Sequence, residues 1–229
     1  MQNYAVTSLI GGTTPGSYSS DIFYMDHGGQ FVLNDGANNT LNSTYPIHQI
    51  SVSSGWIVDG ISVSYNLQGG EPETAIVSHG SVFNPPNGVV TFGANEVLAA
   101  VYGREGYHTT YKRDMITNIA FVVFNTNTEQ YRTAGPFGNG DGSNQGQPFW
   151  TSDVLALGSF GQSTPSLGLS GLLFFRNPSS STNKGLMPPF NFTGEGSTFP
   201  SNWTNNALTP SSNSTSKALM VPESFNSTD

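Results

Sequence analysis

The chain of 229 residues contains no cysteine, and only 10% of its residues are charged. Without cysteine there is no disulfide framework, no thiolate zinc site and no cysteine nucleophile. Lysine and arginine number 7 against 15 acidic residues, too few for the basic patches that hold a phosphate backbone. No apolar stretch reaches the length of a membrane span. We therefore expect no nucleic-acid partner and no insertion into a membrane.

The amino terminus also lacks the pattern of a secretory leader. The first ten residues contain neither a basic segment nor a continuous apolar segment, and a signal peptide needs both. A reducing, cytoplasmic compartment is the simpler expectation for a chain without cysteine, and secretion is the alternative.

Glycine (27 residues) and proline (14 residues) are abundant, together with serine, threonine and asparagine. This composition is typical of short strands joined by tight turns and disfavours helices. Residues 57–65 largely alternate between apolar and small or polar side chains, and residues 97–102 and 119–124 are continuous apolar runs. Both patterns predict strands. We predict an all-β domain over residues 1–176.

The composition changes after Asn177. Residues 177–229 are dense in serine, threonine, asparagine and proline and show no periodicity. Such a segment cannot bury enough apolar surface to form a core of its own, so we predict an extended, mostly irregular tail. Two alternatives stay open: a disordered tail, or an arm whose aromatic residues dock on the folded domain or on a neighbouring subunit.

Four blocks in one order connect the chain to a known family. They are Gly11-Gly12, residues 50–65, the run 119–127 with Gly135-Pro136-Phe137-Gly138 and Pro148-Phe149, and the hairpin 157–172. Together they resemble the jacalin-related lectins, in particular the mannose-binding subgroup of the banana-lectin type. The resemblance implies a β-prism of three four-stranded antiparallel sheets, with metal-independent sugar sites in loops at one end. It implies glycans or glycoproteins as partners, and we expect a homo-oligomer.

A lectin site of this kind needs a carboxylate that accepts hydrogen bonds from sugar hydroxyls, beside backbone N–H groups that donate to the same oxygens. The family carries Gly-x-x-x-Asp in its last hairpin. Here the segment reads Thr164, Pro165, Ser166, Leu167 and Gly168, without a carboxylate. Hydrogen bonds to a charged group contribute about 1.5–3 kcal/mol each, and a millimolar site totals about 4 kcal/mol. Most of the binding at this loop should therefore be lost, although its backbone donors and Ser166 remain candidates.

The same five-residue pattern is complete earlier in the chain. It consists of Gly55, Trp56, Ile57, Val58 and Asp59. The resemblance implies that Asp59 is the acceptor, that the amides of residues 56–58 lie nearby, and that His79 and Gly80 form the neighbouring glycine loop. The structural alternatives are that Asp59 only caps a hairpin by accepting from turn amides, and that Trp56 belongs to the core.

Two further loops are candidates by the same resemblance. The N-terminal glycine loop, Gly11 and Gly12, would lie beside the last hairpin. The segment 103–114 occupies the place of the family's specificity loop, where Tyr107 and His108 could contact the ligand outside the primary site. The alternative for this segment is a solvated hairpin tip.

Enzymatic signatures are missing. There is no nucleophile elbow, no phosphate-binding loop and no histidine spacing typical of a metal site. The segment 139–144 is only partly similar to a calcium loop, because it lacks the terminal bidentate glutamate. We predict a carbohydrate-binding lectin for mannose-like or galactose-like glycans, not an enzyme, without cofactor or metal. The alternative is a prism that has lost sugar binding and acts as an interaction module through its tail.

Overall fold

The computed structural model describes residues 4–14, 16–26, 28–69, 72–161 and 168–176. These residues form fifteen strands and no helix, so no described segment is a helix capable of crossing a membrane. The all-β prediction is confirmed. The predicted tail, residues 177–229, lies outside the described residues.

The first sheet contains the hairpin with the complete Gly-x-x-x-Asp pattern. Its strand order is β8-β7-β6-β9, all antiparallel. The strands are β6 (Ile47–Ser54), β7 (Val58–Asn66), β8 (Thr74–Gly80) and β9 (Gly88–Thr91). Ile61, Val63 and Tyr65 are fully buried, whereas Ser62 and Ser64 between them are partly exposed. The two-residue period therefore marks the inner face of the sheet, as predicted.

The second sheet has the order β12-β11-β10-β13. It consists of β10 (Glu96–His108), β11 (Arg113–Asn125), β12 (Gln130–Gly138) and β13 (Gln147–Ser152). Its two central strands have 13 residues each and form a long hairpin. The continuous apolar runs predicted as strands lie in this hairpin.

The third sheet joins the two ends of the described chain. It is built from β1 (Ala5–Val6), β2 (Ile10–Gly11), β3 (Ser17–Ser20), β14 (Val154–Gly161) and β15 (Leu169–Arg176). It has five strands rather than four, because β1 and β2 pair with successive parts of the same strand, β15. The sheet is therefore four strands wide, with one edge strand broken in two. A separate two-stranded sheet, β4 (Ile22–Met25) with β5 (Phe31–Leu33), was not predicted.

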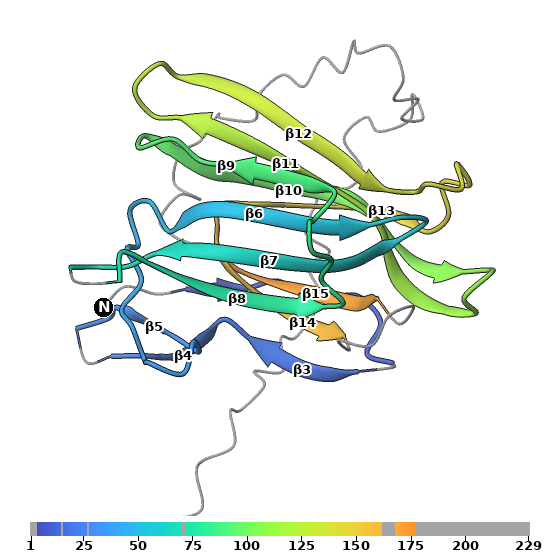
Figure 1. Ribbon diagram of the computed structural model, residues 1–229, viewed down its shortest axis with the longest axis horizontal. Coiled ribbons are helices and arrows are strands. Elements are labelled where there is room, and N and C mark those ends of the chain that lie inside the picture. Colours follow the sequence, from blue (N-terminus) through green and yellow to red (C-terminus); the bar gives the residue numbers. More distant parts are fainter. Residues whose placement is uncertain (1–3, 15, 27, 70–71, 162–167, 177–229) are drawn as a thin grey trace, which may run out of the picture. The chain divides into compact units, whose positions relative to one another are not determined.

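One hydrophobic core is shared by the three large sheets. Figure 1 shows the strands that make up these sheets. Val52 and Ile61 enter it from the first sheet, Phe121 from the second, and Leu157 and Phe174 from the third. All five side chains are fully buried. The turns at one end of the sheets are thus fixed by strands that pack on a common core.

The three large sheets repeat one local arrangement at this end. In each sheet a glycine with positive φ faces the carbonyl oxygen of a neighbouring strand, and a Cβ on it would approach that oxygen to 2.4–2.5 Å. The residue after the glycine donates its backbone N–H to the same oxygen. The glycines are Gly80, Gly11 and Gly138, and the hydrogen bonds are Ser81 to Asp59 (2.8 Å), Gly12 to Ser170 (2.8 Å) and Asn139 to Thr117 (3.0 Å). Asp59, Ser170 and Thr117 are therefore equivalent positions.

A buried polar network joins the first and third sheets. The imidazole Nε2 of His79 lies 2.6 Å from Oδ1 of Asp21, and its Nδ1 lies 2.8 Å from Oγ of Ser159. The hydroxyl of Tyr65 donates to Asp21 and accepts a 3.2 Å hydrogen bond from the backbone N–H of Leu157. The serine, histidine and aspartate are the residue types of a hydrolytic triad. Here Ser159 is only 2% exposed, so the network is structural.

Candidate functional site

The turn between β6 and β7 contains Gly55 to Asp59 and lies at the end of the first sheet. It lies at the same end as the β12–β13 loop and the tip of the β10–β11 hairpin (Figure 1). On one side, the backbone N–H of Gly140 donates a 2.9 Å hydrogen bond to the carbonyl of Gly55. On the other side, Ser81 donates to the carbonyl of Asp59. The turn is therefore held between loops from two sheets.

Asp59 carries a carboxylate without a hydrogen-bond donor among the described residues. Partial burial raises the pKa of this carboxyl from its ordinary value near 4 to about 6. Oδ2 lies 3.9 Å from the point that a Cβ on Gly55 would occupy, so the carboxylate folds back over the turn. A capping aspartate would accept from turn amides, and this one does not. A partly desolvated acceptor without a partner is suited to receiving donors from a ligand.

The middle of the turn divides into exposed and buried residues. Ile57 and Val58 are buried, with 1% and 0% exposure, and anchor the turn in the protein. Trp56 is 49% exposed, so the alternative that its indole belongs to the core is wrong. The backbone N–H groups of Trp56 and Ile57 donate to no other described residue. Since Ile57 is buried, only the amide of Trp56 belongs to an exposed residue of the turn.

His79 and Gly80 lie next to the turn, as expected for the neighbouring glycine loop. Gly80 pairs with Gly60 across the β7–β8 ladder, and its positive φ of 67° places it against the carbonyl of Asp59. The side chain of His79 points the other way, into the buried network, and is 0% exposed. The imidazole of His79 is therefore not available to a ligand, and His79 could contribute to the glycine loop only through its backbone.

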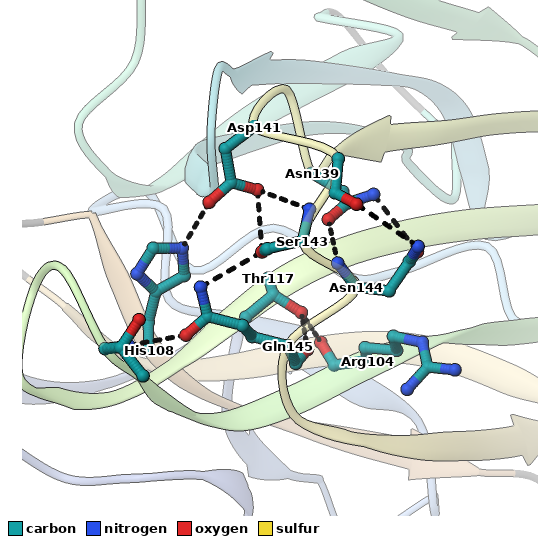
Figure 2. Close-up of polar contacts among 10 residues, drawn as sticks. Arg104, His108, Thr117, Asn139, Asp141, Ser143, Asn144 and Gln145 are labelled. Atoms are coloured by element: carbon teal, nitrogen blue, oxygen red, sulfur yellow. Dashed lines mark hydrogen bonds and ion pairs between the residues drawn. The ribbon is translucent and has the colours of Figure 1, made fainter.

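The loop between β12 and β13 lies beside Trp56, because a Cβ on Gly140 would lie 3.4 Å from Cδ1 of Trp56. Figure 2 shows the polar contacts within this loop. The carboxylate of Asp141 accepts from the backbone N–H of Ser143 (3.0 Å) and from its hydroxyl (2.8 Å). Asn139 and Asn144 exchange two hydrogen bonds, at 2.8 and 3.1 Å. The oxygens that a calcium loop would offer to a metal are thus used inside the loop. Among the described residues, no group of three His, Asp or Glu side chains could hold a metal ion.

The two predicted residues of the specificity loop differ in exposure, because one is exposed and the other is buried. Tyr107 is 55% exposed on β10, as a residue that contacts ligand would be. His108 is fully buried, and its Nε2 lies 3.3 Å from Oδ2 of Asp141 (Figure 2). Hydrogen bonds from Ser143 hold the pKa of Asp141 below its ordinary range, and the imidazole acts in the same direction. The expected contact between His108 and a ligand is corrected, because its imidazole instead lies under the β12–β13 loop.

The N-terminal glycine loop lies beside the tip of the β10–β11 hairpin. The backbone N–H of Gly11 donates a 2.9 Å hydrogen bond to Oε2 of Glu105. A Cβ on Gly12 would lie 2.8 Å from Cβ of Asp114. Two carboxylates of the second sheet, those of Glu105 and Asp114, therefore lie next to the Gly11–Gly12 loop. The strands of the third sheet contain no aspartate.

The last hairpin is described only in part. Thr164, Pro165, Ser166 and Leu167 lie outside the described residues. Gly168 is buried, with a φ of 63°, and a Cβ there would lie 2.7 Å from Cδ1 of Ile57. The position equivalent to Asp59 is Ser170, two residues later, and Ser170 is fully buried. The place of the missing carboxylate is therefore Ser170 and not Gly168.

Sequence reasoning missed the role of three residues that surround the turn. Ser81 and Gly140 donate hydrogen bonds to the backbone of the turn. Asp141 accepts a hydrogen bond within the neighbouring β12–β13 loop. The glycine-rich run 138–142 was an available signal for a tight loop. Nothing in the sequence indicated that this loop contacts Gly55, because the two segments are 85 residues apart.

The comparisons with known proteins agree with this architecture. Residues 25–171 match the family model described as the jacalin-like lectin domain. A comparison with curated protein sequences gives no match.

Three solved structures illustrate the fold. Malaysian banana lectin has a TM-score of 0.52 at 16% identity, and Frutapin from Artocarpus incisa has 0.52 at 18%. An artocarpin–mannotriose complex has 0.52 at 17%. Each alignment covers 76% of this chain and 97% of the other. At such low identity these structures establish the β-prism fold alone. Since the family model matches more than half of the chain, the chain belongs to the jacalin-like lectin family.

Proposed function

We propose that the chain is a carbohydrate-binding lectin whose site is the turn from Gly55 to Asp59. The observation that carries this proposal is the Asp59 carboxylate, which is partly desolvated and accepts from no described residue. A pyranose offers adjacent hydroxyls, and a carboxylate can accept hydrogen bonds from two of them at once. The backbone N–H of Trp56, which donates to no other described residue, supplies a donor to the hydroxyl oxygens.

A mannose-like sugar is the ligand class we favour. The support comes from relatives: one is described as a mannose-binding lectin from Champedak, and artocarpin was solved with mannotriose and with mannopentose. The chemistry proposed for Asp59 needs no metal and no cofactor. It requires only that two donors of the sugar meet the two carboxylate oxygens.

The binding energy should depend on this single charge. Hydrogen bonds to a charged group contribute about 1.5–3 kcal/mol each, while millimolar affinity totals about 4 kcal/mol. The site at the last hairpin lacks this contribution, because Ser170 stands at the equivalent position. We therefore propose one weak site per chain, so that useful avidity requires several copies in a homo-oligomer.

The test is isothermal titration of methyl α-D-mannopyranoside into the wild type and Asp59→Asn. We expect millimolar binding by the wild type and a loss of more than about tenfold in the variant, equivalent to about 1.4 kcal/mol. Asp114→Asn is the matched control, because Asp114 is an exposed carboxylate at the Gly11–Gly12 loop. If Asp114→Asn loses binding and Asp59→Asn does not, the site is at the other loop. If the wild type binds no sugar, the prism has lost this function.

A further inference from the structure

Strand β8 is an open edge of the first sheet. It pairs with β7 on one side, and no described strand pairs with its other side (Figure 1). The strand has seven residues and contains no proline, lysine, arginine, aspartate or glutamate. A long, uncharged edge strand is a template on which another strand can pair.

The other edges of the three large sheets are protected. Strands β3 and β9 have four residues each, and β1 and β2 have two each. Strand β12 contains Pro136, and β13 contains Pro148. Proline has no N–H to offer to a further strand, and short strands and proline keep sheet edges from pairing. Among the described edge strands, only β8 has neither protection.

The backbone of β8 presents donors and acceptors on its open side. In an antiparallel ladder, alternate residues bond to a given neighbour. Ser81 bonds to Asp59 at one end of the ladder with β7, so the odd-numbered residues of β8 face β7. The even-numbered residues Thr74, Ile76 and Ser78 direct their N–H and C=O groups to the open side. No described backbone group on that side bonds to them.

The side chains at this edge are apolar and incompletely covered. Ile76 is 68% exposed, the largest exposure of any large hydrophobic residue in the described part of the chain. It lies on the outer face of the sheet, because it pairs with the partly exposed Ser64. Ala75 and Val77 pack against the core on the inner face, yet both keep partial exposure. A further strand at this edge would cover all three side chains.

We propose that β8 pairs antiparallel with β8 of a second copy of this chain, about a two-fold axis beside Ile76. In this register Ile76 forms a hydrogen-bonded pair with its counterpart. Thr74 lies opposite Ser78 of the second copy, and Ala75 lies opposite Val77. Apolar side chains therefore meet apolar ones, and hydroxyls meet hydroxyls. The first sheet of each copy becomes half of one eight-stranded sheet.

Charge favours a second copy at this edge. The chain has a formal net charge of -8, so two copies repel each other over much of their surface. An isologous interface brings each residue near its own counterpart or its neighbours, so any charge in it would meet a like charge. Strand β8 carries no Lys, Arg, Asp or Glu. It therefore meets the condition for pairing with itself.

The antiparallel pairing also sets the direction of the two sugar sites, a consequence that rests on the proposed function at Asp59. Strand β8 ends at Gly80, which lies against the carbonyl of Asp59. The two Gly80 residues are eight residues apart along the joined strands, or about 27 Å at about 3.4 Å per residue. The two sites thus lie toward opposite ends of the joined sheet, which suits the bridging of two glycan-bearing surfaces.

Sedimentation equilibrium of the full chain tests the interface. The wild type should have twice the mass of one chain. Ile76→Lys should weaken the dimer at least about a hundredfold, because the two-fold axis sets the new charge opposite itself. Val89→Lys is the matched control and should remain dimeric. Val89 lies on β9 at the opposite edge of the same sheet and is 53% exposed.

The register is tested by cysteine cross-linking, since the chain contains no cysteine. The Cα atoms of a hydrogen-bonded antiparallel pair are about 5.5 Å apart, within the range of about 4.4–6.8 Å that a disulfide spans. Oxidation with copper phenanthroline in air should join Ile76→Cys into a covalent dimer. Ser78→Cys should stay unjoined, because its counterpart lies four residues away, at about 14 Å.

Bridging is tested with mannan-coated beads. The wild type and Val89→Lys should clump the beads, whereas Ile76→Lys should bind to them without clumping. The interface is overturned if the wild type sediments as a single chain, if Ile76→Lys remains a dimer, or if Ser78→Cys cross-links better than Ile76→Cys. A dimer that Ile76→Lys dissociates, but that binds neither beads nor mannoside, would support the interface and refute the proposed function alone.

Discussion

The backbone N–H of Ser81 donates a 2.8 Å hydrogen bond to the carbonyl oxygen of Asp59. This bond repeats between Gly12 and Ser170 in the third sheet, so the two aspartate-equivalent positions have the same backbone and different side chains. A fixed backbone carries a carboxylate in one case and a buried hydroxyl in the other. Ligand binding should therefore depend on the side chain at this position rather than on the fold.

Binding should weaken as the pH falls. The ionised form of Asp59 is the acceptor, and burial raises the pKa of its carboxyl to about 6. With a single titrating group, the affinity should be about half its plateau value at pH 6 and roughly a tenth at pH 5. Titration of methyl α-D-mannopyranoside between pH 5 and 8 measures this profile. A flat wild-type profile would contradict the role given to Asp59, and the weak residual binding of Asp59→Asn should be independent of pH.

Removing the same charge should stabilise the protein. The folded state raises the pKa of Asp59 to about 6, above its unfolded value near 4, so the ionised carboxylate disfavours folding. This cost grows as the pH rises from about 4 to about 6 and is constant above that range. Thermal unfolding should give a higher Tm for Asp59→Asn than for the wild type at pH 7.5. The difference should shrink at pH 5, where the wild-type carboxyl is protonated in the folded state. An equal or lower Tm for the variant at pH 7.5 would show that the ionised carboxylate does not destabilise the folded state.

An aspartate at position 168 should damage the fold instead of restoring a site. A Cβ on Gly168 would meet Cδ1 of Ile57 at 2.7 Å, and the φ of 63° disfavours any other residue. Overpacking of this kind costs about 1–3 kcal/mol. Urea unfolding of Gly168→Ala and Gly36→Ala separates the two causes, because Gly36 has a φ of 82° and nothing within 4 Å of its Cβ position. Equal losses in the two variants would mean that the contact with Ile57 costs nothing.

The buried network should contribute to stability and not to binding. Tyr65→Phe removes the hydroxyl that donates to Asp21 and accepts from the backbone N–H of Leu157. Each buried group left without a partner costs about 1–3 kcal/mol. The free energy of unfolding should fall by at least this amount, while the affinity for sugar per folded molecule stays the same. Tyr18→Phe is the control, since Tyr18 is 52% exposed and surface changes stay within about 0.5 kcal/mol.

Much of the fold could be predicted from local pattern. The alternation through Ile61, Val63 and Tyr65 identified the inner face of β7, because successive side chains of a strand point to opposite sides. Pairing over long distances could not be predicted this way. The split edge of the third sheet depends on β1 and β2 meeting β15 at the far end of the chain, and no local signal encodes that register.

The candidate site was predictable to the same extent. The five-residue pattern identified Asp59, but its free carboxylate and the exposure of Trp56 are results of tertiary packing. His79 carries the residue type of a ligand contact, yet Asp21, 58 residues earlier, draws its imidazole into the core. The offset between Gly168 and Ser170 follows from the hydrogen bond that the backbone N–H of Gly12 donates to Ser170, which sequence spacing alone does not reveal.

The most direct test of the central claim is the amide spectrum of the ¹⁵N-labelled protein during titration with methyl α-D-mannopyranoside. We predict that the largest shifts occur at the backbone N–H groups of Trp56, Ile57 and Ser81, and that Asp59→Asn abolishes them. Saturable shifts confined to Gly11 and Gly12, or unchanged shifts in Asp59→Asn, would contradict the assignment of the site to the turn that contains Asp59.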